Sequence, residues 1–353
     1  MKREEIALRY PPSVPHPSGA DPACTSRCGA YLLPRIPYLR LRCTFRAAVP
    51  ATLPPFKGSL LRGAFGHALR RAVCAMGPTQ DCATCRLRPP CFYTRLFETF
   101  LDGDPPPLLR GLDTAPRPYI FEPGTDACVF APGDPLPFDL LLVGQAMDLQ
   151  AYALLALERM AVAGLGRERF RFELDQVEAP GARGTWQTVV AGGRARLPGP
   201  LVPLVPPEDG PAERALLRFQ TPTRIKLRHH LVNEVDFHSL VYAMVRRVLE
   251  LAHVHVPGAA IDWTFRPLLD HAGSVRVTAA DLHWRDWQRY SNRQGRAMKL
   301  GGFEGTLEVE GDLPPFAPLL RAAEVLHVGK GATFGLGRMA IEARDIADKE
   351  WLS

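Results

Sequence analysis

Apolar residues occupy every second position of an early segment, which predicts a half-buried strand over Ile36 to Val49. The polar face of this strand is rich in arginine. After Pro54 and Pro55 the apolar period becomes that of a helix, over about Lys57 to Met76. The apolar stripe of this helix consists of Leu60, Leu61, Ala64, Phe65, Ala68, Leu69, Ala72 and Val73.

The same patterns predict the remaining elements, which fall into two similar halves. The first half adds strands at Tyr119–Phe121, Phe138–Val143 and Arg169–Val177, and a helix at Asp148–Val162. The second half has strands at Leu216–Leu227, Ile261–Pro267, Val275–Tyr290, Phe303–Val309 and Met339–Ala343, and helices at Asp236–Ala252 and Phe316–Leu326. Each half approximates the β-α-β-β-α-β order of a ferredoxin-like domain.

A short motif strengthens the similarity between the halves. Gly164-Leu165-Gly166-Arg167 lies between a predicted helix and strand, and Gly335-Leu336-Gly337-Arg338 occupies the same place in the second half. We interpret this as an internal repeat. The predicted fold is α+β, with two tandem ferredoxin-like (RRM-like) domains and a four-cysteine metal-binding insertion in the first. The predicted limits are a proline-rich leader without packed structure over 1–30, domains over 31–196 and 212–353, and a linker with six prolines over 197–211.

Composition is consistent with this plan and also indicates what kind of molecule the protein binds. A chain of 353 residues is long for one core, so two domains are expected. The net charge of +6 favours an acidic partner, with nucleic acid first. No run of about 18 apolar residues predicts a membrane-spanning helix. The start Lys2-Arg3-Glu4-Glu5 has no apolar segment typical of a secretory signal, so a cytoplasmic location is expected.

Four cysteines with the spacing C-x7-C-x2-C-x5-C follow the first helix, at Cys74, Cys82, Cys85 and Cys91. Thiolates at such short spacing in a reducing compartment favour a closed, structural zinc site over disulfides. An iron–sulfur cluster has the same ligand requirement, so the spacing leaves it open. Four unligated cysteines are the less favoured alternative.

A glycine-rich loop near the C-terminus is the first candidate for binding an anion. Its glycines permit positive φ, which would let a phosphate approach bare backbone N–H groups beside two cations. The loop has neither the strand–GxGxxG–helix order nor the P-loop pattern, so no nucleotide cofactor is expected. The alternative is a glycine-rich connection with no ligand. The candidate residues are Gly329, Lys330, Gly331, Gly335, Gly337 and Arg338.

His67 is the candidate catalytic residue because it falls on the polar face of the first helix. Nearby cations would favour a neutral imidazole, able to accept a proton from a ribose 2′-OH near neutral pH. No clustered carboxylates suggest two-metal hydrolysis, so no catalytic metal is expected. The same face carries two glycines, Gly63 and Gly66, which cost helix stability. It also carries the candidate RNA-binding residues Arg62, Arg70 and Arg71.

Two further basic stretches in the second half are candidates for RNA contact. The strand ending near Leu227 supplies Arg224 and Lys226, and His229 and His230 follow as either RNA contacts, an acid/base pair or simply exposed residues. The segment His283 to Lys299 interleaves cations with aromatic residues, a pattern typical of single-stranded RNA binding, although core-facing strand aromatics would explain the tryptophans equally well. Its candidates are Arg289, Ser291, Arg293, Gln294, Arg296 and Lys299.

Five stretches together resemble the CRISPR-associated repeat-processing endoribonuclease family of the RAMP superfamily. They are Leu61–Leu69, Cys91–Glu98, Phe219–Arg224, Met298–Gly305 and the loop Gly329–Arg338. The resemblance implies metal-independent cleavage of CRISPR precursor RNA at repeat hairpins, leaving a 2′,3′-cyclic phosphate and a 5′-OH. It also implies delivery of the guide RNA to a CRISPR effector complex.

Within this resemblance, His67 matches the position of the family's general base, and Tyr38 and Lys57 are weak candidates for its partner. The cysteine module is absent from many members, so its role is not inherited. The alternative function is a non-catalytic RAMP subunit that binds RNA in an effector complex. A zinc-containing RNA-binding protein outside CRISPR is a third, less favoured possibility.

Overall fold

The structure is a computed structural model. It describes residues 25–28, 31–77, 79–101, 105–110, 112, 114–181, 185–192, 194–195, 211, 213–227, 230–231, 235–286, 288–291, 296–299 and 301–343. Most of the predicted leader and linker therefore lies outside the described residues, as do the candidates Arg293 and Gln294. For Arg289, Ser291, Arg296 and Lys299 the description covers the backbone alone.

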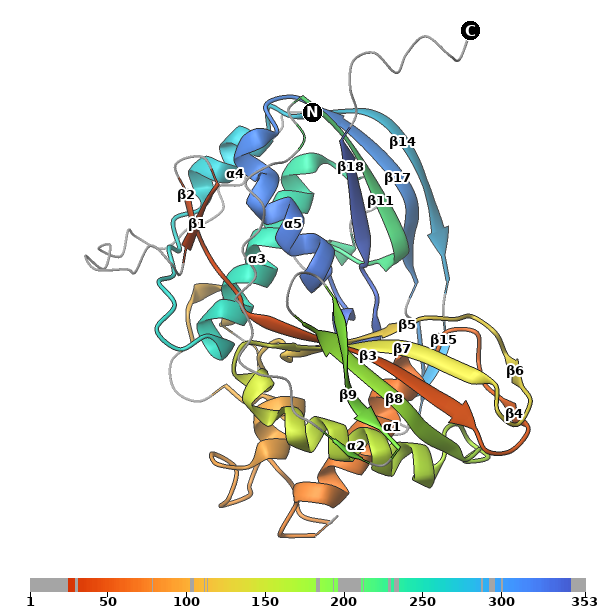
Figure 1. Cartoon of the computed structure of the whole chain (residues 1–353). Coiled ribbons are helices and arrows are strands. Elements are labelled where there is room, and N and C mark those ends of the chain that lie inside the picture. The colour runs from red at the N-terminus through yellow and green to blue at the C-terminus, as the bar shows by residue number, and fades with distance from the viewer. Residues whose placement is uncertain are drawn as a thin grey trace, which may run out of the picture.

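The first half forms an antiparallel sheet with two helices on one face (Figure 1). Its elements in chain order are β3 (Tyr38–Ala47), α1 (Gly58–Val73), β5 (Tyr119–Pro123), β7 (Pro135–Val143), α2 (Gln150–Ala163) and β8 (Phe172–Pro180). The strand order β8-β3-β7-β5 is that of a ferredoxin-like domain. The sheet is extended past β8 by β9 (Trp186–Ala191) and β10 (Arg194–Ala195).

The second half repeats this plan. Its elements are β11 (Arg214–Thr223), α3 (Phe237–His255), β14 (Arg276–Arg285), β17 (Gly302–Glu310), α5 (Ala317–Leu326) and β18 (Met339–Ala343). The strand order β14-β17-β11-β18 is again ferredoxin-like, and all pairs are antiparallel. Two tandem ferredoxin-like folds are thereby confirmed.

Shorter elements connect these strands and helices. Four short two-stranded sheets accompany the two main sheets. They are β1 (Thr25–Cys28) with β2 (Tyr31–Pro34), β4 (Ala51–Thr52) with β6 (Val129–Phe130), β12 (Lys226–Leu227) with β13 (His230–Leu231), and β15 (Gln288–Ser291) with β16 (Arg296–Lys299). The remaining short helices are η2 (Thr94–Glu98), η3 (Pro107–Leu109), η4 (Gly144–Leu149), α4 (Arg266–Ala272), η6 (Pro314–Phe316) and η7 (Ala332–Phe334).

The strand predicted over Ile261 to Pro267 is wrong. Residues 261–265 have no regular structure, and α4 begins at Arg266 with Pro267 in its first turn. Proline suits that position because the first helical N–H groups have no intrahelical partner. The strand predicted over Val275 to Tyr290 is divided between β14 and β15.

Each sheet buries its own apolar core, as the alternation in β3 predicts. Leu39, Leu41, Cys43 and Phe45 are all at most 1% exposed and pack under α1 and α2. One segment crosses between the halves: β2 and the residues after it pack with α3 in the second core, through Tyr31, Leu33 and Ile36. No helix in the described part of the chain is long and apolar enough to cross a membrane.

The backbone supports the internal repeat. Gly164 and Gly166 have φ of 88° and 82°, and Gly335 and Gly337 have φ of 83° and 74°. Both pairs enclose a leucine, Leu165 or Leu336, that is 0% exposed. The two Gly-Leu-Gly-Arg turns therefore share a left-handed backbone around an anchoring leucine, which is why glycine occurs at these positions.

Candidate nucleic-acid interface

A broad groove with a volume of about 2220 Å³ runs along α1. Helix α1 and the end of α2 line it, together with the segment around Phe97 and with Gly331, Thr333 and Phe334 of the second half. Two acids, Asp81 and Glu98, face seven arginines in its lining. Such a surplus of guanidinium groups suits a polyanion. The arginines are Arg62, Arg70, Arg71, Arg117, Arg159, Arg167 and Arg169.

His67 lies in this groove with an exposed side chain. The apolar stripe of α1 determines this orientation, because Leu61, Phe65 and Leu69 are 0% exposed and turn the opposite face outward. The imidazole is therefore accessible to a ligand that occupies the groove, as a general base must be.

The two glycines of α1 have different explanations. A Cβ at Gly66 would lie 2.2 Å from the ring of Phe97, so the aromatic ring occupies the space that a side chain would need. The sequence placed Gly66 on the polar face of the helix, but Gly66 is buried beneath this aromatic side chain. A Cβ at Gly63 would meet nothing within 4 Å. Gly63 leaves open space in the groove one helical turn before His67.

Arg62 lies where the two halves meet. Its guanidinium is 4.4 Å from the ring centre of Phe97 and 5.3 Å from that of Phe334, which belongs to the glycine loop of the second half. A Cβ at Gly58 would lie 1.7 Å from the carbonyl oxygen of Phe334, so the start of α1 touches the same loop. Two aromatic rings thus restrain a cation beside the groove.

The glycine loop uses many of its amides inside the protein. The N–H of Lys330 donates to the Arg224 carbonyl at 2.9 Å, and the N–H of Gly337 donates to the Pro222 carbonyl at 3.1 Å. The N–H of Gly335 donates to Ala332 at 2.8 Å. Sequence reasoning expected bare amides facing a phosphate, and these three amides are occupied. The glycines instead allow close backbone contact with β11 and with Phe121 of the first half.

Three predicted RNA-binding cations from two segments come together beside this loop. Burial lowers the pKa of Lys330, and the nearby charges of Lys226, Arg246 and Arg224 lower it further. Cations therefore outweigh the one nearby carboxylate, Glu250, around the ammonium of Lys330, and this surplus suits an anion. Arg224, Lys226 and Lys330 form one basic cluster, and the adjacent Gly331 lines the groove.

The last arginine of the loop contacts a buried ionic group at the junction of the halves. Arg338 Nη1 lies 3.8 Å from Glu122 Oε2. Glu122 also accepts hydrogen bonds from Arg40 at 2.6 Å and faces His327 Nε2 at 3.0 Å. The guanidinium of Arg338 therefore already has a carboxylate partner within the protein.

Arg70 turns toward the cysteine module. It donates to the backbone carbonyl of Gln80, and it lies in electrostatic range of Cys82 and Cys74. Burial raises the pKa of the Cys82 thiol, and the nearby Cys91 and Cys74 act in the same direction. However, no group of three or more potential ligands in metal-binding geometry occurs among the described residues. The predicted zinc site is not supported by the arrangement of the four thiols.

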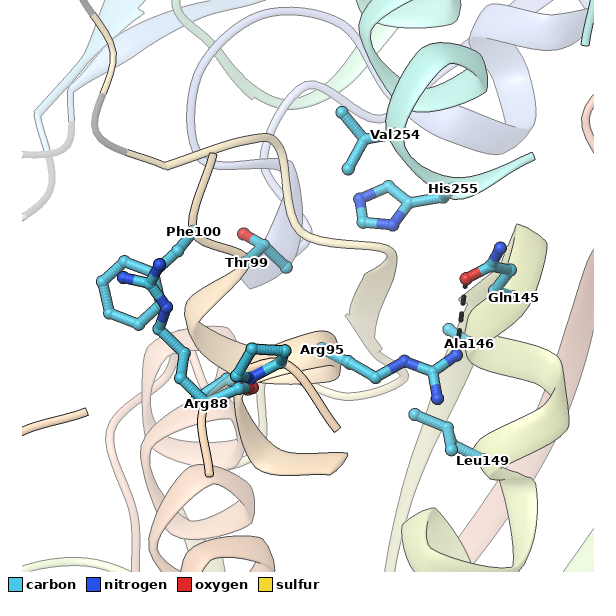
Figure 2. A pocket seen from close by; sticks show the side chains of 11 residues that line it. Arg88, Arg95, Thr99, Phe100, Gln145, Ala146, Leu149, Val254 and His255 are labelled. Atoms are coloured by element: carbon cyan, nitrogen blue, oxygen red, sulfur yellow. Dashed lines mark hydrogen bonds between the residues drawn. The ribbon is translucent and has the colours of Figure 1, made fainter. Parts of the chain in front are cut away.

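A second, smaller cavity of about 240 Å³ lies between the segment after the cysteines and the end of α3 (Figure 2). Within it, Arg95 donates to the Gln145 side chain at 3.4 Å, and Arg88 stacks 5.2 Å from the ring centre of Phe100. His255 Nε2 lies 2.7 Å from the Pro116 carbonyl oxygen. Its polar groups bond mainly to the protein, so this cavity is the weaker candidate for a ligand.

Comparisons with known proteins agree with this geometry. Residues 217–339 match the family model described as CRISPR-associated endoribonuclease Cas6, and residues 35–201 match the N-terminal domain model AF_1859_N. The second half of the chain therefore matches the Cas6 family model. Among solved structures the chain resembles Thermus thermophilus Cas6 in a product complex, with 16% identity and a TM-score of 0.53, covering 86% of this chain and 100% of that one.

A second similar structure is a partial Cas6-RT-Cas1–Cas2 complex, with 13% identity and a TM-score of 0.50, covering 88% of this chain and 47% of that one. No curated protein matches the chain. The match to the Cas6 model supports the predicted class: an endoribonuclease that processes CRISPR precursor RNA.

Neither residue suggested as a partner of the candidate general base His67 lies among the groove residues. Lys57 is 0% exposed, and its Nζ donates to the carbonyls of Pro55 and Thr125 at 3.2 Å. Tyr38 packs against the core of the second half. The general acid is therefore not assigned to either.

Sequence reasoning missed several residues in and near this groove. Arg117, Arg159, Arg167 and Arg169 line the groove, and His327 lies buried at the junction of the halves. A signal for Arg167 was present, since it ends the first copy of the Gly-Leu-Gly-Arg repeat. The others come from segments with no distinctive pattern.

Proposed function

We propose that this protein cleaves CRISPR precursor RNA within its repeats by metal-independent transesterification, with His67 as the general base. The observation that carries the proposal is an exposed imidazole on α1 within a groove lined by seven arginines. The basic lining binds and orients the RNA backbone, and the imidazole meets the ribose hydroxyl. The substrate is CRISPR repeat RNA, and the site of action is the cytoplasm.

The reaction needs only the RNA and protein side chains. His67 accepts the proton of a 2′-OH as that oxygen attacks the adjacent phosphorus. The bond from phosphorus to the 5′-oxygen breaks, and this oxygen takes up a proton. The products are a 2′,3′-cyclic phosphate and a 5′-OH, so atoms and charge balance without a metal.

Arg62 and Arg71 are placed to stabilise negative charge on the reacting phosphate. Arg71 follows His67 by four residues on α1 and is exposed, so the two side chains share a helix face. Arg62 is restrained by two aromatic rings, which lowers the entropy lost when it binds an anion.

The test is cleavage of labelled repeat RNA in excess EDTA by the wild type and by His67→Ala. We expect cleavage by the wild type, with a 5′-hydroxyl that polynucleotide kinase can label directly. The variant should lose about 10²- to 10⁴-fold in rate, the range for a general base, with little change in RNA affinity. Full activity of His67→Ala would remove this residue from the mechanism.

A guide-holding role in a CRISPR effector complex is the second candidate, and the basic cluster of Arg224, Lys226 and Lys330 favours it. Such a cluster retains RNA whether or not the chain cuts it. Tight binding of repeat RNA by the wild type without cleavage would select this alternative.

We also propose a structural zinc ion bound by Cys74, Cys82, Cys85 and Cys91. The short spacing of the thiols supports it. Binding would require the four thiols to come closer together than they lie in the structure. The ion has no part in the cleavage step.

A further inference from the structure

The turn after α2 is held rigidly. Helix α2 ends at Ala163 and is capped by Gly164, and Leu165 and Phe170 exchange backbone hydrogen bonds of 2.8 and 2.9 Å. Between them the N–H of Arg169 donates to the Gly166 carbonyl at 3.3 Å. Since Leu165 is 0% exposed, the turn is anchored in the core, whereas Arg167 and Arg169 at its tip are exposed.

Arg169 occupies a backbone conformation that disfavours its side chain. Its φ is 55°, in the left-handed region that glycine adopts with least strain. The turn is tight at this point, because a Cβ at Gly164 would lie 2.2 Å from the Arg169 carbonyl oxygen. Packing does not explain the arginine, because its side chain is exposed.

The groove provides an explanation. Arg159, one turn before the end of α2, lines it together with Arg167 and Arg169. In the part of the chain that the structure describes, none of these three guanidinium groups is paired with a carboxylate. In the second copy of the repeat, by contrast, Arg338 lies near the buried Glu122.

We propose that Arg159, Arg167 and Arg169, the α2 arginine cluster, bind backbone phosphates of the RNA beside the linkage that His67 cleaves. The identity of the ligand as RNA rests on the proposed function. The contacts are to phosphates rather than to bases, so they add affinity without reading sequence. The rigid turn holds the backbone of Arg167 and Arg169 in place before RNA binds, which reduces the entropy lost on binding.

The first test uses Arg169→Gly, which removes the side chain and suits the backbone. In the His67→Ala background, which prevents cleavage, we expect RNA affinity at 0.15 M salt to fall about three- to tenfold, while the melting temperature stays equal or rises. Arg266→Ala serves as the control, because Arg266 is 61% exposed on α4 and lies outside the groove. It should change neither quantity.

The second test combines Arg159→Ala, Arg167→Ala and Arg169→Gly. The slope of log affinity against log salt should become shallower by about 2, since each phosphate contact contributes about 0.7 with single strands. The loss should be equal for repeat RNA and for unrelated RNA of the same length. With His67 restored, kcat at saturating RNA should stay within about threefold of wild type while KM rises.

An unchanged salt slope in a folded triple variant would overturn the cluster and leave the proposed cleavage standing. A loss confined to repeat RNA would also overturn it, because phosphate contacts do not distinguish sequence. If instead the wild type binds RNA without cutting it, the proposed function fails, and the binding measurements still support or overturn the cluster.

Discussion

His327 Nε2 lies 3.0 Å from Glu122 Oε1, and both side chains are buried, at 0% and 4% exposure. His327 precedes the glycine loop of the second half, whereas Glu122 belongs to β5 of the first. The other ring nitrogen, Nδ1, lies 3.0 Å from the Leu336 carbonyl oxygen. Through these two contacts the imidazole of His327 joins the two halves beneath the loop.

Acid should weaken this junction within a defined pH range. Burial raises the pKa of Glu122, but hydrogen bonds from His327 and Arg40 outweigh it and lower the pKa to about 2. The stabilisation is therefore complete above the ordinary pKa of 4.5 and is lost as pH falls toward 2. A shift of this size corresponds to roughly 3 kcal/mol.

Glu122→Gln should flatten the dependence of unfolding free energy on pH between 4.5 and 2, as measured by urea denaturation at a series of pH values. Glu173→Gln, an exposed residue of β8, is the matched control and should leave the wild-type slope unchanged. Equal slopes for the wild type and Glu122→Gln would contradict the assignment.

His255 should produce a separate loss of stability at higher pH. Burial lowers its pKa to about 4, so the folded protein holds the ring neutral while the unfolded chain protonates near 6.5. Stability should therefore fall as pH decreases from 6.5 to 4, by up to about 3 kcal/mol.

His255→Gln retains an N–H donor for the Pro116 carbonyl and should remove this slope. The control is His283→Gln, because the His283 side chain is 67% exposed. Urea unfolding midpoints at pH 7, 5.5 and 4 would measure the difference, and a slope that persists in His255→Gln would show that another group titrates.

The glycines of α1 provide a matched pair. Gly66→Ala places a methyl group against the Phe97 ring and should destabilise the protein by about 1–3 kcal/mol. Gly63→Ala meets open space and should stabilise it by up to about 1 kcal/mol through helix propensity.

If RNA approaches the α1 backbone at Gly63, the Gly63→Ala variant should melt at a higher temperature yet cleave more slowly. Thermal unfolding and single-turnover cleavage would measure both effects. Faster or unchanged cleavage would show that the space beside Gly63 is not used by the substrate.

The zinc proposal predicts one zinc per purified chain by elemental analysis. Cys85→Ser should lower this ratio, whereas Cys128→Ser should not, because Cys128 is an exposed cysteine outside the module. A metal-free wild type, or iron with a visible absorption band in place of zinc, would refute it.

Hydrophobic periodicity predicted those features of the fold that depend on residues close together in sequence. The alternation in β3 and the stripe of α1 correctly indicated which residues are buried, and the outward position of His67 followed from that stripe. The segment 261–267 misled because its alternating apolar residues pack on α3 without strand pairing, and Pro267 favours a helix start.

Contacts between distant segments were beyond such patterns. Glu122 and His327 are 205 positions apart, so no periodicity indicates that they meet. The same holds for the occupied amides of the glycine loop, whose acceptors Pro222 and Arg224 lie on and beside another strand. Arg159 of α2 was missed because a helical surface arginine looks the same in sequence with or without a groove beside it.

The crossing of β2 into the second core has a consequence for synthesis and truncation. The hydroxyl of Tyr31 bonds to the carbonyl of Asp262, 231 positions further along the chain. During synthesis the segment around Tyr31 leaves the ribosome long before its packing partners in the second half. Until they are made, it stays exposed to solvent or in a transient contact. Removing the segment around Tyr31 from the second half would expose apolar surface there. The two ferredoxin-like units are therefore not separable by a single cut in the linker.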